Sequence, residues 1–252
     1  MSFDVAATAY DRFMGRFSGP LAGVFADAAG VRPGLRALDV GCGPGALTSV
    51  LVQRLGAERV TAVDPSPPFV EAVRSRLPGV EVTAGSAESL AFADDSFDVT
   101  LAQLVVHFMA DPVSGLAEMA RVTSPGGVVA ACVWDHGGDS GPLSLFWRAV
   151  RDVDPRAAGE ADLPGSREGH LVALCEAAGL QGPASSRLKV TVTFGSFEQW
   201  WEPYTLGVGP AGAYVAALDD VRRDAVRARC EALLPPPPFD VAASAWCVRA
   251  DV

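Results

Sequence analysis

Apolar residues in the first half of the chain alternate between short continuous runs and longer segments with helical spacing. The short runs predict strands at 37–40, 60–63, 80–82, 97–104 and 128–134. The periodic segments predict helices at 21–29, 46–55, 67–77 and 112–120. Because strands and helices take turns along the chain, we expect right-handed βαβ units and a largely parallel sheet. The strand runs lack clean alternation, which indicates burial on both faces.

The pattern is less regular beyond Trp134. We expect helices at 143–153, 197–220 and 221–234, together with a helix capped by Ser166 and closed by Gly179. We expect strands at 188–194 and 239–249. The four prolines at 235–238 predict a stiff connector before the last strand.

A glycine-rich turn follows the first predicted strand and contains Gly41, Gly43 and Gly45. Glycine allows the sharp bend from a strand into a helix, and it lets a ligand approach the backbone closely. The N-terminus of the following helix then offers unpaired N–H groups to that ligand. The turn also fits the loose dinucleotide pattern G-x-G-x-x-G/A over 41–46, so an NAD-dependent oxidoreductase is one hypothesis.

Two carboxylates accompany this turn. Asp64 ends the second strand, where a carboxylate can hold two ribose hydroxyls, as it also does in dehydrogenases. Asp39 lies inside the first strand, where a charge is costly unless it meets a ligand or a donor. Asp39 therefore distinguishes this turn from that of an ordinary dehydrogenase.

The segment 38–45, with the sequence LDVGCGPG, resembles the first signature of class I S-adenosylmethionine-dependent methyltransferases. The segments 63–66, 85–92, 95–99 and 124–127 resemble the signatures that follow it in that family, in the family's order and spacing. The N-terminal segment 10–14 is similar to the small-molecule branch of the family, which is related to quinone-biosynthesis methyltransferases.

The resemblance implies a role for each matching residue. Asp39 would orient backbone and water near the methionine portion of the cofactor, Asp64 would bind the ribose hydroxyls, and Ala87 would contact the adenine. The other implied cofactor-binding residues are Gly41, Cys42, Gly43, Pro65, Ser66, Gln103 and Leu104. Many relatives carry Asp where this chain has Ser86. A serine hydroxyl accepts a hydrogen bond from the adenine amino group more weakly than a carboxylate does, and Glu88 could assist it.

In relatives, the N-terminal segment folds over the cofactor. Arg16 could therefore pair with the cofactor carboxylate, and Tyr10 could close the methyl site; an ordinary amphipathic segment is the alternative. His107 follows the fourth strand and is a candidate catalytic residue with Tyr10, since a histidine can deprotonate a nucleophile. A packing role for His107 is the alternative, and His136 is a weaker candidate.

Aromatic residues form a further candidate group. Trp200, Trp201 and Tyr204 share one helical face with Phe197, a pattern that is more often core than ligand site. Together with Phe146 and Trp147, they could instead form a substrate lid that binds a flat apolar molecule or a cation.

Composition narrows the choice of partners. The chain has 252 residues and a formal net charge of −10, without the basic surface that binds nucleic acid. We expect a small-molecule substrate, no nucleic acid and no membrane, with a homodimer left open. The N-terminus lacks the pattern of a signal peptide, and the five scattered cysteines suit a reduced cytoplasm rather than a disulfide framework or a metal site.

We therefore expect an α/β protein, a Rossmann-like three-layer sandwich whose mostly parallel sheet has seven strands by resemblance and an antiparallel last strand. Residues 1–252 should form a single methyltransferase domain, with lid insertions at about 135–165 and 196–235. The expected cofactor is S-adenosyl-L-methionine, and the expected reaction is methyl transfer to a small-molecule oxygen, nitrogen or carbon. An oxidoreductase or a non-catalytic S-adenosylmethionine-binding protein are the alternatives.

Overall fold

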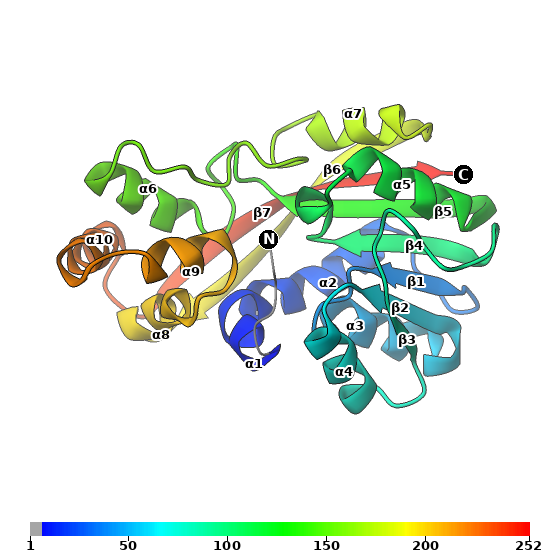
Figure 1. Cartoon of the computed structure of the whole chain (residues 1–252), viewed down its shortest axis with the longest axis horizontal. Helices are drawn as coiled ribbons and strands as arrows, with labels where there is room; N and C mark the ends of the chain where they lie inside the picture. The colour runs from blue at the N-terminus through cyan, green and yellow to red at the C-terminus, as the bar shows by residue number, and fades with distance from the viewer. Residues whose placement is uncertain (1–6) are drawn as a thin grey trace.

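A seven-stranded sheet forms the centre of the computed structural model, which describes residues 7–252 (Figure 1). Its strand order is β3-β2-β1-β4-β5-β7-β6. The strands are β1 (Ala37–Val40), β2 (Val60–Asp64), β3 (Glu81–Ala84), β4 (Phe97–Gln103), β5 (Thr123–Trp134), β6 (Gln181–Phe194) and β7 (Phe239–Asp251). Strands β1 to β5 pair in parallel, whereas β7 lies antiparallel to both β5 and β6. The expected Rossmann-like sheet and its antiparallel last strand are confirmed.

Helices cover both faces of this sheet. One face packs against α2 (Arg16–Ala28), α3 (Ala46–Leu55) and α4 (Pro67–Arg76), through residues such as Leu21, Leu51 and Val73. The other face packs against α5 (Pro112–Arg121) and α7 (His170–Ala177), through Leu116 and Leu171. The sheet is thus the middle layer of three, as the strand pattern predicts.

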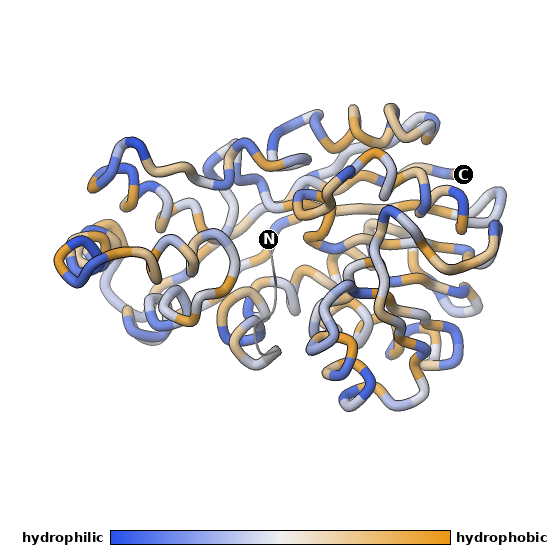
Figure 2. The backbone as a smooth tube through the Cα atoms, viewed as in Figure 1, coloured by the Kyte–Doolittle hydropathy of each residue, from blue (hydrophilic) through white to orange (hydrophobic). Residues whose placement is uncertain are grey.

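A further group of helices gathers at one end of the molecule, on the left in Figure 1. It consists of α6 (Ser144–Val153), α8 (Phe197–Trp201), the 3-10 helix η4 (Glu202–Leu206), α9 (Gly209–Ala216) and α10 (Asp220–Leu233). Hydrophilic and hydrophobic residues alternate along α10 (Figure 2), and its Val226 and Cys230 are buried. We call this group the helical end.

Several predicted boundaries differ from the structure. Helix α7 begins at His170 with Gly169 at its N-cap, and Ser166 does not cap it because its hydroxyl donates to the carbonyls of Ala161 and Leu163. Helix α2 begins at Arg16 rather than at 21, and β5 begins at Thr123 rather than at 128.

The predicted helix 197–220 is divided into α8, η4 and α9, because Pro203 lacks an N–H and Gly207 adopts a φ of 72°. Strand β6 begins at Gln181 rather than at 188, since its first residues lie mostly exposed on an edge strand, carry no large apolar side chain and therefore give no apolar signal.

The N-terminal part of the described chain consists of α1 (Ala7–Tyr10), a π-helical turn η1 (Asp11–Gly15) and then α2. Within residues 7–252, no helix has the length and apolar character needed to cross a membrane.

Candidate functional site

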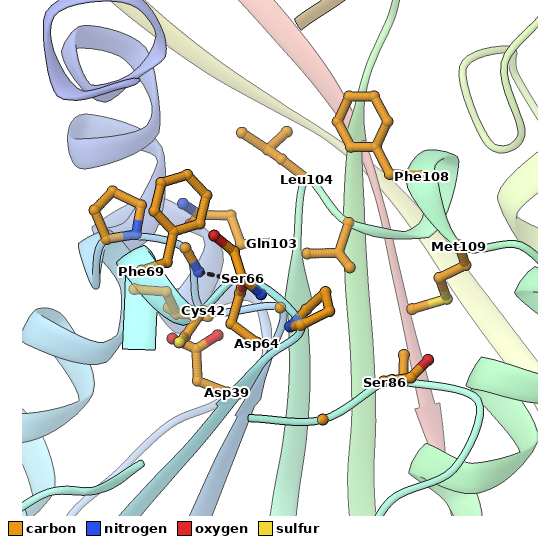
Figure 3. Close-up of a pocket in the computed structure, with 18 of the residues that line it drawn as sticks. Asp39, Cys42, Asp64, Ser66, Phe69, Ser86, Gln103, Leu104, Phe108 and Met109 are labelled. Atoms are coloured by element: carbon orange, nitrogen blue, oxygen red, sulfur yellow. Dashed lines mark hydrogen bonds between the residues drawn. The ribbon is translucent and has the colours of Figure 1, made fainter. Parts of the chain in front are cut away.

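A cavity of about 740 Å³ opens at the carboxyl ends of β1, β2 and β4 (Figure 3). In an open α/β sheet, this edge is where ligands bind. Thirteen of the sequence-predicted site residues line the cavity: Tyr10, Asp39, Gly41, Cys42, Gly43, Asp64, Pro65, Ser66, Ser86, Ala87, Glu88, Gln103 and Leu104. Segments far apart in sequence therefore meet at one site.

The glycine turn brings bare backbone to the cavity. Gly41 adopts a φ of 68°, and a Cβ atom there would lie 2.5 Å from Cγ2 of Val105. The N–H groups of Gly41 and Cys42 both donate to the carbonyl of Val63, at 2.7 and 3.1 Å. Gly45, with a φ of 98°, is the N-cap of α3. No residue with a side chain could follow this path without strain at Gly41.

Asp64 holds two of the surrounding loops in place. One carboxylate oxygen accepts from the N–H of Gly43 at 2.8 Å, and the other accepts from the N–H of Ser66 at 2.8 Å. Burial of this side chain raises its pKa, although the two hydrogen bonds act in the opposite direction. Because each carboxylate oxygen has about two lone-pair sites, Asp64 can still accept from two ribose hydroxyls.

Asp39 is almost fully buried, with 1% of its surface exposed. Thr48 donates its hydroxyl to Oδ2 at 2.6 Å, but within residues 7–252 Oδ1 has no hydrogen-bond partner. Burial raises the pKa of Asp39 to about 7. A buried acceptor without a partner is costly and suits a ligand that brings a donor or a positive charge. S-adenosylmethionine carries both, so Asp39 fits this cofactor.

The raised pKa of Asp39 predicts a pH dependence of stability. Between about pH 4 and pH 7 the unfolded chain ionises this residue while the folded chain keeps it protonated, so the free energy of unfolding falls as pH rises. From pH 5 to pH 8, the wild type should lose about 2–3 kcal/mol more than Asp39→Asn. Urea unfolding of both ligand-free proteins at the two pH values measures this difference. Equal losses of unfolding free energy in the two proteins would contradict a raised pKa at Asp39.

Ser86 and Glu88 form the opposite end of the cavity, after β3. The Ser86 hydroxyl donates to the Glu88 carboxylate, which also accepts from the N–H of Ala110 at 2.8 Å. Partial burial raises the pKa of Glu88, but these hydrogen bonds outweigh it and lower the pKa overall. Ser86 and the ionised carboxylate of Glu88 therefore form a hydrogen-bonded pair beside the cavity. The oxygens of this pair could accept a hydrogen bond from the amino group of adenine.

The remaining predicted residues lie elsewhere. The Arg16 guanidinium lies 5.4 Å from the ring centre of Phe194 and is not among the residues that line the cavity. His107 is buried against Phe108 and does not line the cavity either. Burial and nearby His136 lower the pKa of His107 to about 3, which makes it a weak general base. The pairing of Arg16 with the cofactor carboxylate and the catalytic role of His107 remain predictions.

The five predicted lid aromatics are buried in the helical end and do not line the cavity: Phe146, Trp147, Trp200, Trp201 and Tyr204. Phe146 stacks on Tyr204 at 4.5 Å, and Trp147 donates its indole N–H to Glu160 at 2.6 Å. These contacts are typical of a packed core, which is the more common role of an aromatic helical face.

Sequence reasoning missed several cavity residues. Ser18 of α2, Phe69 of α4, and Val105, Phe108 and Met109 after β4 all line the cavity. Leu104 adopts a φ of 62°, an uncommon conformation for leucine. Within the described chain, no group of three His, Cys, Asp or Glu residues is arranged to hold a metal.

The largely parallel sheet and the strand order define a Rossmann-like fold, and the glycine turn and two acids lie at the carboxyl ends of its neighbouring strands. Residues 38–131 match a family model described as a methyltransferase domain. The matched segment contains the glycine turn and both acids. This segment of the chain is therefore similar to a methyltransferase domain.

Several curated proteins are similar to part of this chain. The uncharacterized methyltransferase Rv3342 of Mycobacterium tuberculosis is 38% identical over 54% of this chain and 52% of that protein. A demethylmenaquinone methyltransferase of Renibacterium salmoninarum is 37% identical over 44% of this chain and 46% of that protein. The chain therefore spans about half the length of these curated relatives.

A solved structure, the YcgJ protein of Bacillus subtilis, matches with a TM-score of 0.59 and 19% sequence identity. The match covers 91% of this chain and 97% of that chain, so the two share a fold.

Proposed function

We propose that this protein is an enzyme that transfers a methyl group from S-adenosylmethionine to a small-molecule acceptor. The observation that carries the proposal is the pair of buried acids, Asp39 and Asp64, on either side of a glycine turn that lines one cavity. Asp64 would hold the ribose, the turn would accommodate the methionine portion, and Ser86 with Ala87 would contact the adenine.

S-adenosylmethionine supplies an activated methyl group on a sulfonium sulfur. The protein then needs to align an acceptor oxygen, nitrogen or carbon with that methyl group and to exclude water. Leu104, Phe108 and Met109 give the cavity an apolar wall for this purpose. Tyr10, packed against the ring of Phe69 at 5.5 Å, would close the side formed by the N-terminal segment.

We further propose that the segments 135–165 and 196–235 act as a lid within a single domain. The turn that carries Asp11 to Gly15 connects the cavity with the helical end: Arg12 pairs with Glu202 at 2.5 Å, and the ring of Phe13 meets that of Tyr204 at 5.1 Å. A movement of the helical end would therefore reach Tyr10, which precedes this turn.

The cavity has three acidic side chains and no lysine or arginine among the described residues that line it. A neutral or cationic small molecule suits such a lining better than an anion. We propose a small-molecule acceptor rather than nucleic acid or a membrane surface, and a cytoplasmic location, which the five cysteines, all free, support.

The test is a screen for methyl transfer with S-adenosylmethionine labelled in its methyl group. Phenols, quinone precursors and amines are offered as acceptors. We expect label in at least one product, with one S-adenosylhomocysteine formed for each methyl group transferred. Binding of the cofactor without transfer to any acceptor would instead favour a non-catalytic binding protein.

A further inference from the structure

The guanidinium group of Arg76, in the last turn of α4, joins two segments that border the cavity. Its Nη1 donates to the main-chain carbonyl of Pro44, in the glycine turn, at 3.2 Å. Its Nη2 lies 2.7 Å from Oδ2 of Asp11, in the π-helical turn η1. Pro44 lines the cavity, and so does Tyr10, the residue before Asp11. Arg76 thus connects two walls of the cavity from outside it.

Residues 10–15, which we call the N-terminal turn, are held from two sides by neighbouring residues of opposite charge. Asp11 pairs with Arg76 of α4, as described above, and Arg12 pairs with Glu202 of η4 at 2.5 Å. The N-terminal turn therefore lies between α4 and the helical end (Figure 1). Loss of either ion pair would leave it attached on one side only.

Tyr10 is the residue of the N-terminal turn that reaches the cavity. Its ring meets the ring of Phe69, another cavity residue, edge-on at 5.5 Å. A single contact between two rings is weak. The position of Tyr10 therefore depends on how the next residue, Asp11, is anchored to α4.

The ion pair between Asp11 and Arg76 has the properties of a contact that can open and close. The side chains are 38% and 42% exposed, so water and salt reach both charges. Partly exposed ion pairs are weak, and added salt screens them. Such a pair can hold the N-terminal turn in place and still release it when a ligand enters or leaves.

We propose that Arg76 is a positioning residue that fastens the N-terminal turn beside the cavity and so slows the departure of a bound adenosyl ligand. While the pair with Asp11 is intact, Tyr10 and Pro44 are held on neighbouring sides of the cavity. When the pair breaks, the N-terminal turn can move away from α4 and that side of the cavity opens. This inference rests on the proposed function, because it takes S-adenosylmethionine as the cofactor.

Surface plasmon resonance with immobilised protein and S-adenosylhomocysteine tests the proposal, because it measures association and dissociation rates separately. Arg76→Gln removes the charge, whereas Arg76→Lys keeps it but replaces the forked guanidinium with a single nitrogen. Asp11→Asn removes the charge on the other side of the pair. The matched control is Arg74→Gln, two residues earlier in α4. Arg74 donates to the carbonyl of Val82 at 3.1 Å, and neither residue lines the cavity.

We expect Arg76→Gln to raise the dissociation rate about tenfold, because it loses both contacts, and to change the association rate less than about twofold. Arg76→Lys and Asp11→Asn should each raise the dissociation rate about threefold, the effect of one exposed ion pair. The double variant Asp11→Asn/Arg76→Gln should match Arg76→Gln, since both changes remove the same pair. Raising the salt concentration from about 0.05 M to about 0.5 M should bring the wild type closer to Asp11→Asn.

The control separates this role from a loss of helix stability. Arg74→Gln and Arg76→Gln each remove one arginine from the last turn of α4, so urea unfolding should show similar, small destabilisation in both. Only Arg76→Gln should release S-adenosylhomocysteine faster.

Two results would overturn the proposal alone: an unchanged dissociation rate in Arg76→Gln, or an equal increase in Arg74→Gln. A wild type that does not bind S-adenosylhomocysteine at all would overturn the proposed function as well. The two failures are therefore distinguishable in one set of measurements.

Discussion

Replacing Asp64 with alanine should weaken the binding of S-adenosylhomocysteine by about a hundredfold or more. Hydrogen bonds to a charged group contribute about 1.5–3 kcal/mol each, and the variant loses two such bonds to the ribose. It also releases the N–H groups of Gly43 and Ser66, which Asp64 holds at 2.8 Å each, so the surrounding loops lose their fixed positions. Calorimetric titration of the wild type and the variant measures the effect.

Asp98→Asn is the matched control for this experiment. Asp98 lies near the amino end of β4 and accepts from the N–H of Arg36 at 2.7 Å, at the opposite edge of the sheet from the cavity. Its substitution should leave binding of S-adenosylhomocysteine unchanged. An Asp64→Ala protein that is folded and binds as tightly as the wild type would remove Asp64 from the site.

Gly41→Ala should destabilise the fold and abolish cofactor binding. The φ of 68° costs a residue with a side chain about 1–2 kcal/mol. The new Cβ would also lie 2.5 Å from Cγ2 of Val105, and overpacking of this kind costs about 1–3 kcal/mol more. We expect the free energy of unfolding, measured in urea, to fall by about 2–5 kcal/mol.

Gly43→Ala separates the two causes. Gly43 also has a positive φ, of 54°, but no atom lies within 4 Å of where its Cβ would be. It should therefore show only the conformational penalty, about 1–2 kcal/mol. The double variant Gly41→Ala/Val105→Ala should lose less free energy of unfolding than the losses of its two single variants added together. Equal destabilisation by the two glycine substitutions would show that contact with Val105 is unimportant.

The strands and helices up to Trp134 could be predicted because each leaves a strong local signal. Their apolar runs and helical faces are separated by glycine and proline, and the predicted parallel pairing follows from the βαβ connections. Beyond that residue, local signals are weaker. The exposed start of β6 and the break at Pro203 are set by pairing with β7 and by a single proline, which hydrophobic patterning does not register.

The cofactor side of the site could be predicted more fully than its N-terminal wall. Asp39, Gly41 and Asp64 belong to short contiguous signatures, and the structure places all three at the cavity. Which residues of α2 face the cavity depends on how the helix is rotated about its axis. The π-helical turn at 11–15 changes this rotation, because it contains an extra residue per turn. Sequence spacing therefore could not predict that Ser18, rather than Arg16, lines the cavity.

The aromatic stripe shows a different limit. Regular spacing predicted one helical face for Trp200, Trp201 and Tyr204, and it could not predict what that face contacts. In the structure these rings are buried with Phe146 and Phe13, at the helical end. Periodicity identifies an apolar surface, and only the tertiary arrangement decides whether a ligand or another helix covers it.

The most direct measurement is a calorimetric titration of the wild-type protein with S-adenosylhomocysteine and, separately, with NAD. If the acid-flanked turn holds an adenosyl cofactor with an amino-acid tail, the homocysteine ligand binds at one site per chain and NAD gives no heat of binding. Binding of NAD with no binding of S-adenosylhomocysteine would contradict the account.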